Sequence, residues 1–320
     1  MSTLSVIVPA RNAEAYLDAC MSSILSDLHE GDKLVIVDDG SSDSTRDIAC
    51  RIATSFPGHV TVVDGHGRGV SAARNLGLAI SSGDYVAFCD ADDTYLPGAL
   101  SQMRAILDKD ATLDIVIGGF RRDYPEGCRI EAVETFSAEE AIANTLYQRP
   151  GWHESAWAKM YRRTILNTVS PLFIEGRRYE DLEATPRIYL AAKQIAFTAS
   201  PVYWYRDNDS SFLAAWSPAR ADALWATAEV ERTITLHCPT LLPAARCRRL
   251  SAAFNILALS SAAGADAIAR QSWDIIKALR HSVVCDRRAR LRNIVAAALS
   301  YTGSTPTRLL SRLHEYYKNL

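Results

Sequence analysis

Three carboxylates stand within four residues of one another, directly after an apolar run, in the stretch YVAFCDADDTYLPGAL at residues 85–100. Asp90, Asp92 and Asp93 would repel one another unless a positive charge lay between them. Hard oxygen ligands at Asp-x-Asp spacing suit a divalent cation, Mg²⁺ or Mn²⁺. Such ions keep coordination positions for substrate phosphates, so this interpretation implies a phosphate-bearing ligand. A solvated turn with Asp93 or Thr94 as a helix cap is the plainer alternative.

A second acidic segment favours the metal interpretation. The stretch VDDGSSDST places Asp38 and Asp39 directly after another β-branched run, and Asp64 ends a third such run. Ligands bind at the carboxyl ends of the strands in open α/β sheets. We therefore expect Asp38, Asp39, Asp64 and Asp90 to converge on one crevice.

The elements that must position these side chains alternate between strand and helix. Such alternation predicts an α/β fold with a mostly parallel central sheet and helices on its faces. Strands are predicted at residues 4–10, 33–39, 60–64, 85–90 and 114–120, and helices around residues 17–25, 48–52 and 70–82.

Strand signals cease after about Phe212, and Ala- and Leu-rich helical segments follow. We place a boundary near residue 213, between an α/β domain (1–213) and a helical C-terminal region (214–320). The first part holds 20 Lys and Arg against 30 Asp and Glu, and the second holds 15 against 7. The net charges are therefore −10 and +8, which suggests an anionic partner for the C-terminal region.

The last residues predict an amphipathic helix. Leu309, Leu313 and Tyr316 recur at helical spacing, with Arg308 and Arg312 beside them. Two interpretations stay open. The apolar stripe packs on the protein's own helices or on a second subunit in a homodimer, or it docks on the surface of a membrane.

Composition sets further bounds. The N-terminal residues have no basic region before a long apolar one, and no apolar run approaches the length of a bilayer span. The seven cysteines are scattered and form no Cys-x-x-Cys pair, which suits a reducing compartment. The histidines show no zinc-binding spacing. We expect a cytoplasmic protein that can also contact the inner face of the membrane peripherally.

Three stretches in this order and spacing resemble the family 2 glycosyltransferases, which have the nucleotide-sugar-binding GT-A fold. They are SVIVPARNAEAYLDACMSSIL, LVIVDDGSSDST and GVSAARNLGLAISSGDYVAFCDADDTYLPGAL. The stretches WAKMYRRTIL, RRYEDLEATPRIYLA and YWYRDNDSS are similar more loosely, to the members that build bacterial surface polysaccharides. The resemblance covers roughly residues 3–213. It implies an inverting transfer of a sugar from a nucleotide-diphosphate donor, a UDP-sugar, to a hydroxyl of a saccharide or lipid-linked acceptor.

The resemblance also implies a donor site. Asp39, with Asp38, would bind the base, and Arg74 would lie near the diphosphate or orient an acidic residue. Arg11 departs from the family pattern, in which many members have Tyr, so that it either contacts the diphosphate or packs outward. The implied donor-binding residues are Pro9, Ala10, Arg11, Asp38, Asp39, Arg74, Asp90 and Ala91.

Metal-binding and catalytic residues follow from the same resemblance. Asp92 and Asp93, with Asp90, would hold Mn²⁺ or Mg²⁺. Asp181 matches the position expected of the catalytic base, with Glu180 beside it. A base at that place would remove the proton of the acceptor hydroxyl as it attacks the anomeric carbon.

Other functions remain as alternatives. GRGVSA at residues 67–72 fits the dinucleotide fingerprint Gly-x-Gly-x-x-Ala, which would indicate an oxidoreductase, but it leaves the Asp pairs without a role. A nucleotide-sugar-binding protein without transferase activity is a second alternative, and the retained Asp-x-Asp motif argues against it. Nucleic acid is not expected among the partners.

Overall fold

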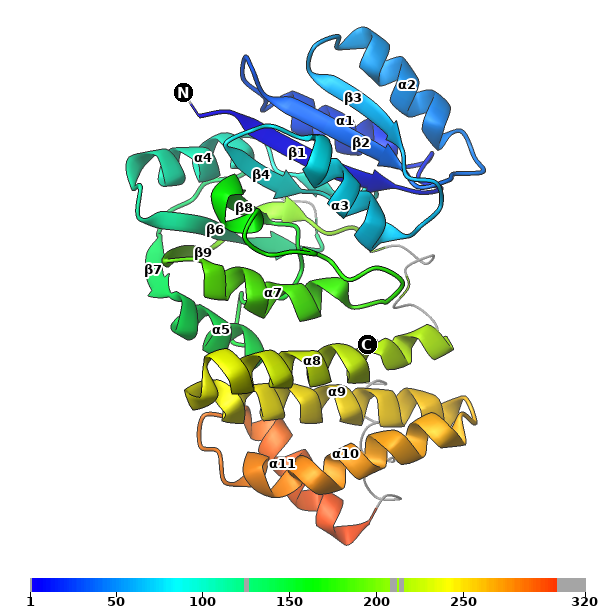
Figure 1. The fold of residues 1–320 in the computed structure, drawn as a ribbon, viewed down its shortest axis with the longest axis vertical. Coiled ribbons are helices and arrows are strands. Elements are labelled where there is room, and N and C mark those ends of the chain that lie inside the picture. The colour runs from blue at the N-terminus through cyan, green and yellow to red at the C-terminus, as the bar shows by residue number, and fades with distance from the viewer. Residues whose placement is uncertain (1, 124–126, 208–211, 213–215, 304–320) are drawn as a thin grey trace. The chain divides into compact units, whose positions relative to one another are not determined.

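The computed structural model describes residues 2–123, 127–207, 212 and 216–303 (Figure 1). The boundary expected near residue 213 and the amphipathic segment at 304–320 therefore lie outside the described residues. The chain divides into two compact units. The first comprises Met1–Ala141, His153–Gly176 and Arg187–Asp209, and the second comprises Ile142–Trp152, Arg177–Pro186 and Ser210–Leu320.

The first unit is built on one sheet, which has nine strands in the described part of the chain. Its parallel half has the order β3 (Val60–Asp64), β2 (Lys33–Asp38), β1 (Leu4–Ala10) and β4 (Tyr85–Phe88). The order continues through β8 (Lys159–Arg162), β6 (Leu113–Arg121), β9 (Gln194–Trp204) and β5 (Thr94–Tyr95), and β7 (Glu134–Ser137) pairs with β9.

Antiparallel pairing is more frequent in this sheet than the sequence predicted. Strand β8 runs antiparallel to both β4 and β6, and β5 and β7 run antiparallel to β9. The predicted α/β class is confirmed, but the sheet is mixed. Alternation of strands and helices could predict only the parallel half, because the later strands pair across long stretches of sequence.

Alternating side chains of the strands face different helices. Val6, Val8 and Ile36 share a core with α1 (Leu17–Leu25), α2 (Thr45–Ser55) and α4 (Ala99–Lys109). Val35 and Val37 pack on the other face against α3 (Val70–Ile80). This division follows from the two-residue period of a strand. The predicted helix at residues 17–25 is confirmed at both ends, and the short helix α6 spans Arg163–Leu166.

The second unit is mainly helical. Helix α9 (Leu242–Ala262) packs against α8 (Asp222–His237), α10 (Asp266–Val284) and α11 (Leu291–Leu299) (Figure 1). Helices α5 (Ala138–Leu146) and α7 (Glu180–Ala191) are each shared between the two units. Short 3₁₀ helices lie at Pro218–Ala221, Pro239–Leu241 and Ser300–Thr302. In the described part of the chain no helix is both long and apolar enough to span a bilayer.

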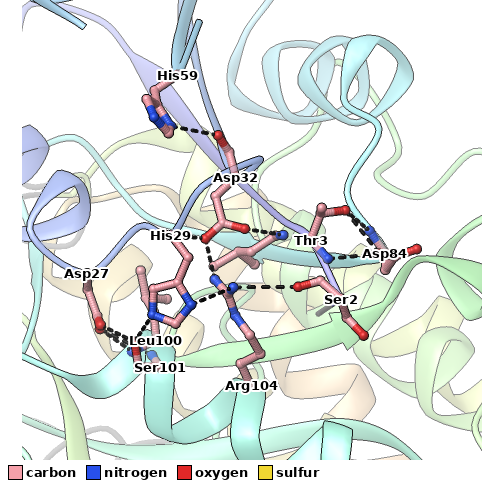
Figure 2. A network of polar contacts seen from close by, with 11 residues as sticks. Ser2, Thr3, Asp27, His29, Asp32, His59, Asp84, Leu100, Ser101 and Arg104 are labelled. Carbon is pink, nitrogen blue, oxygen red and sulfur yellow. Dashed lines mark hydrogen bonds and ion pairs between the residues drawn. The ribbon is translucent and has the colours of Figure 1, made fainter.

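A buried polar network joins elements at the amino ends of the central strands (Figure 2). Asp32 is fully buried, and its carboxylate accepts the N–H groups of Leu4 and His29, each at 2.8 Å. The guanidinium of Arg104, on α4, pairs with the same carboxylate and lies 3.1 Å from His29 Nδ1. The network ties α4 to the start of β1 on the side of the sheet away from the acidic strand ends.

Candidate active site

The parallel strands bring their carboxyl ends to one edge, as expected. Asp38, the last residue of β2, is in register with Ala10 of β1 and with Asp64 of β3. The N–H of Asp39 donates to the carbonyl of Ala10 at 2.8 Å. Phe88 of β4 pairs with Ile7 of β1, and the acidic turn that begins at Asp90 follows directly. Strand register therefore places the predicted acidic groups along a single edge.

Asp39 is a buried carboxylate with one oxygen left over. Its side chain is 5 % exposed, and Oδ2 accepts the N–H of Gly69 at 2.9 Å and lies 4.0 Å from Arg11 Nη1. Oδ1 is buried and has no hydrogen-bond partner among the described residues. A Cβ at Gly65 would lie 3.1 Å from that oxygen, so glycine leaves the space beside it open. Because a carboxylate only accepts hydrogen bonds, Oδ1 is suited to an N–H donor of a ligand.

Arg46 partly balances the neighbouring acids. Its Nη1 lies 3.4 Å from Asp38 Oδ2 and 3.4 Å from Asp64 Oδ2. The pKa of Asp64 is lowered, chiefly by the backbone N–H of His66 and further by the charges of His66 and Arg46. Arg46 was not predicted from the sequence, in which its position in the first turn of α2 was the only signal.

Arg74 holds the first residue of the acidic turn. Its guanidinium is buried, its Nη2 lies 2.6 Å from Asp90 Oδ1, and it also lies over the ring of Phe173 at 5.5 Å. This pair agrees with the predicted orientation of an acidic residue by Arg74, and contact of Arg74 with the diphosphate stays a prediction. A charge-assisted bond of this length fixes the direction of the Asp90 carboxylate.

Asp93 has different surroundings from its neighbour Asp92. It is 1 % exposed, and its two oxygens lie 3.0 Å from the hydroxyl of Tyr203 and 2.9 Å from the N–H of Arg206. Burial, followed by the charges of Asp90 and Asp92, raises the pKa of Asp93 to about 8. Its predicted role as a metal ligand stays a prediction, with hydrogen bonding inside the protein as a competing role.

A divalent cation is compatible with the remaining donors. Asp90 and Asp92 are both partly exposed and could each offer a carboxylate to an ion. In the described residues no group of three or more His, Cys, Asp or Glu side chains is arranged to hold a metal. Mg²⁺-type sites commonly use one or two carboxylates and complete their coordination with substrate phosphates. The residues present therefore fit a metal that binds together with a diphosphate.

Arg206 is a second site residue that the sequence analysis did not single out. Its Nε donates to the carbonyl of Asp92 at 3.0 Å. Its guanidinium lies over two aromatic rings, 5.2 Å from the centroid of Tyr16 and 4.3 Å from that of Trp204. The stretch YWYRDNDSS contained the only signal for it. This arrangement holds a positive charge beside the acidic turn.

An aromatic stack supports the same turn. The ring centroid of Trp157 lies 4.8 Å from that of Tyr203 and 5.0 Å from that of His153. The rings of Trp157 and Tyr203 are nearly parallel. Tyr203 in turn contacts Asp93 and accepts the N–H of Asp90 at 3.1 Å. Packing of buried rings thus fixes a hydroxyl against two residues of the acidic motif.

Glu180 and Asp181 begin α7 and belong to the second compact unit. Glu180 is buried, and the N–H of Leu182 donates to Asp181 Oδ1 at 2.8 Å. Tyr179, just before them, has φ of 60°, a left-handed backbone conformation that is uncommon for a residue other than glycine. Such strain often occurs at functional sites. The catalytic roles of Asp181 and Glu180 remain predictions.

Comparison with known proteins gives a consistent result. The model of the family described as "Glycosyl transferase family 2" matches residues 5–170. The chain is 30% identical over 241 residues to glycosyltransferase GlyG of Streptococcus pneumoniae, covering 71% of this chain and 77% of GlyG. It is 28% identical over 221 residues to the uncharacterized glycosyltransferase YibD of Escherichia coli, covering 65% of this chain and 62% of YibD.

Solved structures share the fold. Residues 1–349 of TarS from S. aureus, in complex with UDP-GlcNAc, superpose with a TM-score of 0.73 at 21% identity, over 94% of this chain and 91% of that one. The mannosyltransferase PcManGT from Pyrobaculum calidifontis, in complex with GDP-Man and Mn²⁺, superposes with a TM-score of 0.54 at 16% identity, over 99% and 80%. At these identities the likeness concerns the fold alone.

Proposed function

This chain belongs to glycosyl transferase family 2 and is a glycosyltransferase of GT-A-type fold, and from that premise we propose that it transfers a sugar from a UDP-sugar to a hydroxyl group, with inversion at the anomeric carbon. The acceptor would be a saccharide or a lipid-linked saccharide precursor. The observation that carries the proposal is the buried Oδ1 of Asp39, which has no hydrogen-bond partner in the described part of the chain and lies on the same sheet edge as Asp90 and Asp92.

Asp39 supports a particular class of nucleotide. An acceptor-only group needs a ring N–H opposite it, and uracil has such a group at N3, as guanine has at N1. Adenine and cytosine have no ring N–H on the corresponding edge. We favour uracil because the sequence resemblance implies a UDP-sugar donor and a structure that shares the fold is a complex with UDP-GlcNAc.

The acidic turn would receive the diphosphate. Asp90 and Asp92 would hold Mn²⁺ or Mg²⁺, and the ion, when bound, would offset the charge that develops on the leaving diphosphate. Arg74 keeps the Asp90 carboxylate in place through their 2.6 Å contact. Arg206 adds a fixed cation beside Asp92, where it would contact a phosphate oxygen.

On the acceptor side, Asp181 would act as the general base, and Glu180 is the next candidate. A hydroxyl is a weak nucleophile, so a positioned carboxylate that takes its proton contributes roughly 10²–10⁴-fold to the rate. Asp181→Asn should therefore lower kcat while leaving UDP affinity nearly unchanged. Near-normal turnover of this variant would assign Asp181 a structural role.

Calorimetry with the variant Asp39→Asn tests the nucleotide site. The amide oxygen can still accept the N–H of Gly69, which leaves the amide nitrogen, a donor, facing the ring N–H of the base. Leaving a buried donor unsatisfied should weaken UDP binding about tenfold or more. Asp84→Asn, an exposed acid at the other edge of the sheet, is the matched control.

Titration of the wild-type protein with UDP, GDP and NADH, with and without Mn²⁺, completes the test. We expect UDP to bind most tightly and Mn²⁺ to strengthen it. Equal UDP affinity in both conditions, or preferential NADH binding, would overturn the proposal. The fingerprint at residues 67–72 does follow β3 and open α3, but the N–H of Gly69 is used to hold Asp39.

A further inference from the structure

Helix α11 has an exposed apolar face in a region that lacks acidic residues. Leu291 and Val295 are 75% and 47% exposed and lie one helical turn apart, so they share one face. Tyr301, just after the helix, is 54% exposed. Residues 287–303 contain four arginines and no Asp or Glu. Exposed large apolar side chains thus lie in a stretch with excess positive charge, and Asp286, just before that stretch, is the nearest acid in the sequence.

Several arginines of the second unit gather around this face. Arg292 lies close enough to Arg290 and Arg248 for their charges to lower its pKa, after the larger effect of burial. Its Nη2 lies 3.2 Å from Gln148 Oε1, a neutral partner. Like charges this close repel one another, and an anion supplied from outside would offset that repulsion.

Tyr147 organises two more arginines of the same cluster. The guanidinium groups of Arg149 and Arg288 lie 5.7 Å and 5.5 Å from the centroid of its ring. Arg149 also donates to the carbonyl of Arg288 at 3.1 Å. The nearby carboxylate of Asp286 is 8 % exposed and accepts the Tyr147 hydroxyl at 2.5 Å, whereas the side chain of Arg288 is 53 % exposed. Arg288 Nε also lies 3.6 Å from Asp286 Oδ1, so this acid offsets part of the charge of Arg288, whose exposed side chain stays accessible to a further anion.

We propose that the α11 face, defined by Leu291, Arg292 and Val295, with Arg288 in the turn just before the helix, docks on an anionic phospholipid bilayer. The arginines would contact lipid phosphates, which bind guanidinium groups in bidentate fashion. Leu291 and Val295 would enter the boundary between headgroups and acyl chains, as the apolar face of an interfacial helix does. A single partner would then contact both the arginines and the exposed apolar side chains of the face.

A second copy of the chain fits this face less well. In a two-fold symmetric contact the same patch lies on both sides, so the arginines of both copies would lie within one interface. That contact would bury Leu291 at the cost of like-charge repulsion. An anionic surface removes the repulsion and covers the apolar side chains together. The proposal concerns attachment and does not depend on which donor or acceptor the enzyme uses.

Co-sedimentation of the full chain with vesicles tests the proposal. One set contains phosphatidylcholine and phosphatidylglycerol in equal parts, and the other contains phosphatidylcholine alone. We expect binding to the anionic vesicles only, weakened by salt. Each arginine near such a surface contributes about 1 kcal/mol, so Arg292→Glu should weaken partitioning by at least about fivefold. Leu291→Asp should weaken it about tenfold or more, because its buried apolar area is lost.

The chain offers matched controls for both variants. Leu236→Asp changes a 67% exposed leucine on α8, and Arg270→Glu changes an exposed arginine on α10, both outside the α11 face. We expect both controls to bind as the wild type does. Failure of the wild type to bind anionic vesicles at low salt, equal binding to both vesicle sets, or equal effects of variants and controls would overturn the proposal.

Sedimentation velocity without vesicles identifies the alternative occupants. A dimer that Leu291→Asp dissociates would assign the face to a second copy and would overturn membrane docking. If the wild type does not bind vesicles but binds an acidic polypeptide such as polyglutamate, and Arg292→Glu weakens that binding, the face binds a protein partner and membrane docking is overturned. UDP calorimetry on Leu291→Asp should remain as for the wild type, because the donor site lies in the other unit.

Discussion

At the scale of single residues, Asp92 and Asp93 are neighbours in sequence with different surroundings. Asp92→Asn should weaken the Mn²⁺-dependent part of UDP binding by at least tenfold, since even outer-shell changes at metal sites cost about 10–100-fold. Asp93→Asn should have little effect at pH 7, because a carboxyl with a pKa of about 8 is mostly protonated there and an amide has the same shape. Calorimetry with and without Mn²⁺ measures both.

An equal loss in the two variants would show that Asp93 binds the metal, as the sequence predicted. A bound cation would then have to lower the pKa of Asp93 enough to ionise it. The electron paramagnetic resonance spectrum of Mn²⁺ in the presence of UDP gives an independent readout, because removal of a carboxylate ligand changes it.

Gly65 gives a second prediction at this scale. An added Cβ would lie 3.1 Å from both the Cα and Oδ1 of Asp39, tighter than most contacts of a real side chain. Gly65→Ala should therefore weaken UDP binding by displacing the Asp39 carboxylate, with a smaller loss of stability. Gly127→Ala, where a Cβ would meet nothing within 4 Å, is the control. Unchanged UDP affinity in Gly65→Ala would place the base elsewhere.

The sequence predicted that Asp38, Asp39, Asp64 and Asp90 lie at strand ends because each follows an apolar run, and the strand register agrees, whereas their roles in binding stay predictions. Sequence reasoning did not find Arg46, whose role depends on α2 packing beside β3. It also could not tell Asp93 from Asp92, since the groups that enclose Asp93 come from Tyr203 and Arg206. Those contacts join residues more than a hundred positions apart, and no local pattern encodes them.

At the scale of elements, the network of Asp32 and Arg104 fixes α4 against the start of the sheet (Figure 2). Asp32→Ala should lower the free energy of unfolding by about 3–5 kcal/mol, because removing one partner of a buried pair leaves the other charge uncompensated. Asp84→Ala, which removes exposed bonds to Thr3, should cost much less. Urea unfolding measures both variants, and equal costs would contradict a special role for the buried pair.

His153 predicts a pH dependence of stability. It is buried, its Nε2 lies 3.3 Å from the carbonyl of Gly118, and its Nδ1 lies 3.1 Å from Lys159 Nζ, which suits a neutral ring. Burial, followed by the charge of Lys159, holds the pKa of His153 well below 6.5. The folded state therefore binds fewer protons than the unfolded state, so stability is full above about pH 6.5 and falls as the pH is lowered.

Unfolding measured from pH 7 to pH 5 checks this expectation. His153→Gln should show a shallower loss of stability than the wild type. His66→Gln, at an exposed position, should retain the wild-type slope. The same slope in all three proteins would mean that His153 does not titrate with unfolding.

At the scale of the whole molecule, the helical unit includes segments that the sequence assigned to the α/β domain. Residues 142–152 and 177–186 belong with the C-terminal helices, and Tyr147 hydrogen-bonds Asp286. The composition change after Phe212 indicated where the C-terminal helices begin. It could not show that two earlier segments belong to the same compact unit as those helices. Compactness depends on contacts between distant residues, whereas composition describes only neighbours in sequence.

Tyr147→Phe tests whether the segment 142–152 stabilises the helical unit through its bond to Asp286. Loss of a hydrogen bond to a carboxylate should lower the free energy of unfolding by about 1.5–3 kcal/mol. Tyr301→Phe, an exposed tyrosine of the same unit, should have almost no effect. Differential scanning calorimetry separates the two, and an equal, negligible effect would show that the segment adds no stability through this bond.

The position of the Asp32–Arg104 network has a consequence for how such an enzyme can diversify. The groups that hold the sheet to α4 lie at the amino ends of the strands, and the groups that meet the ligand lie at the carboxyl ends. Mutations that alter the ligand edge therefore leave the anchoring edge intact. Descendants of this sheet can therefore change their donor and acceptor preferences without losing the bonds that anchor α4.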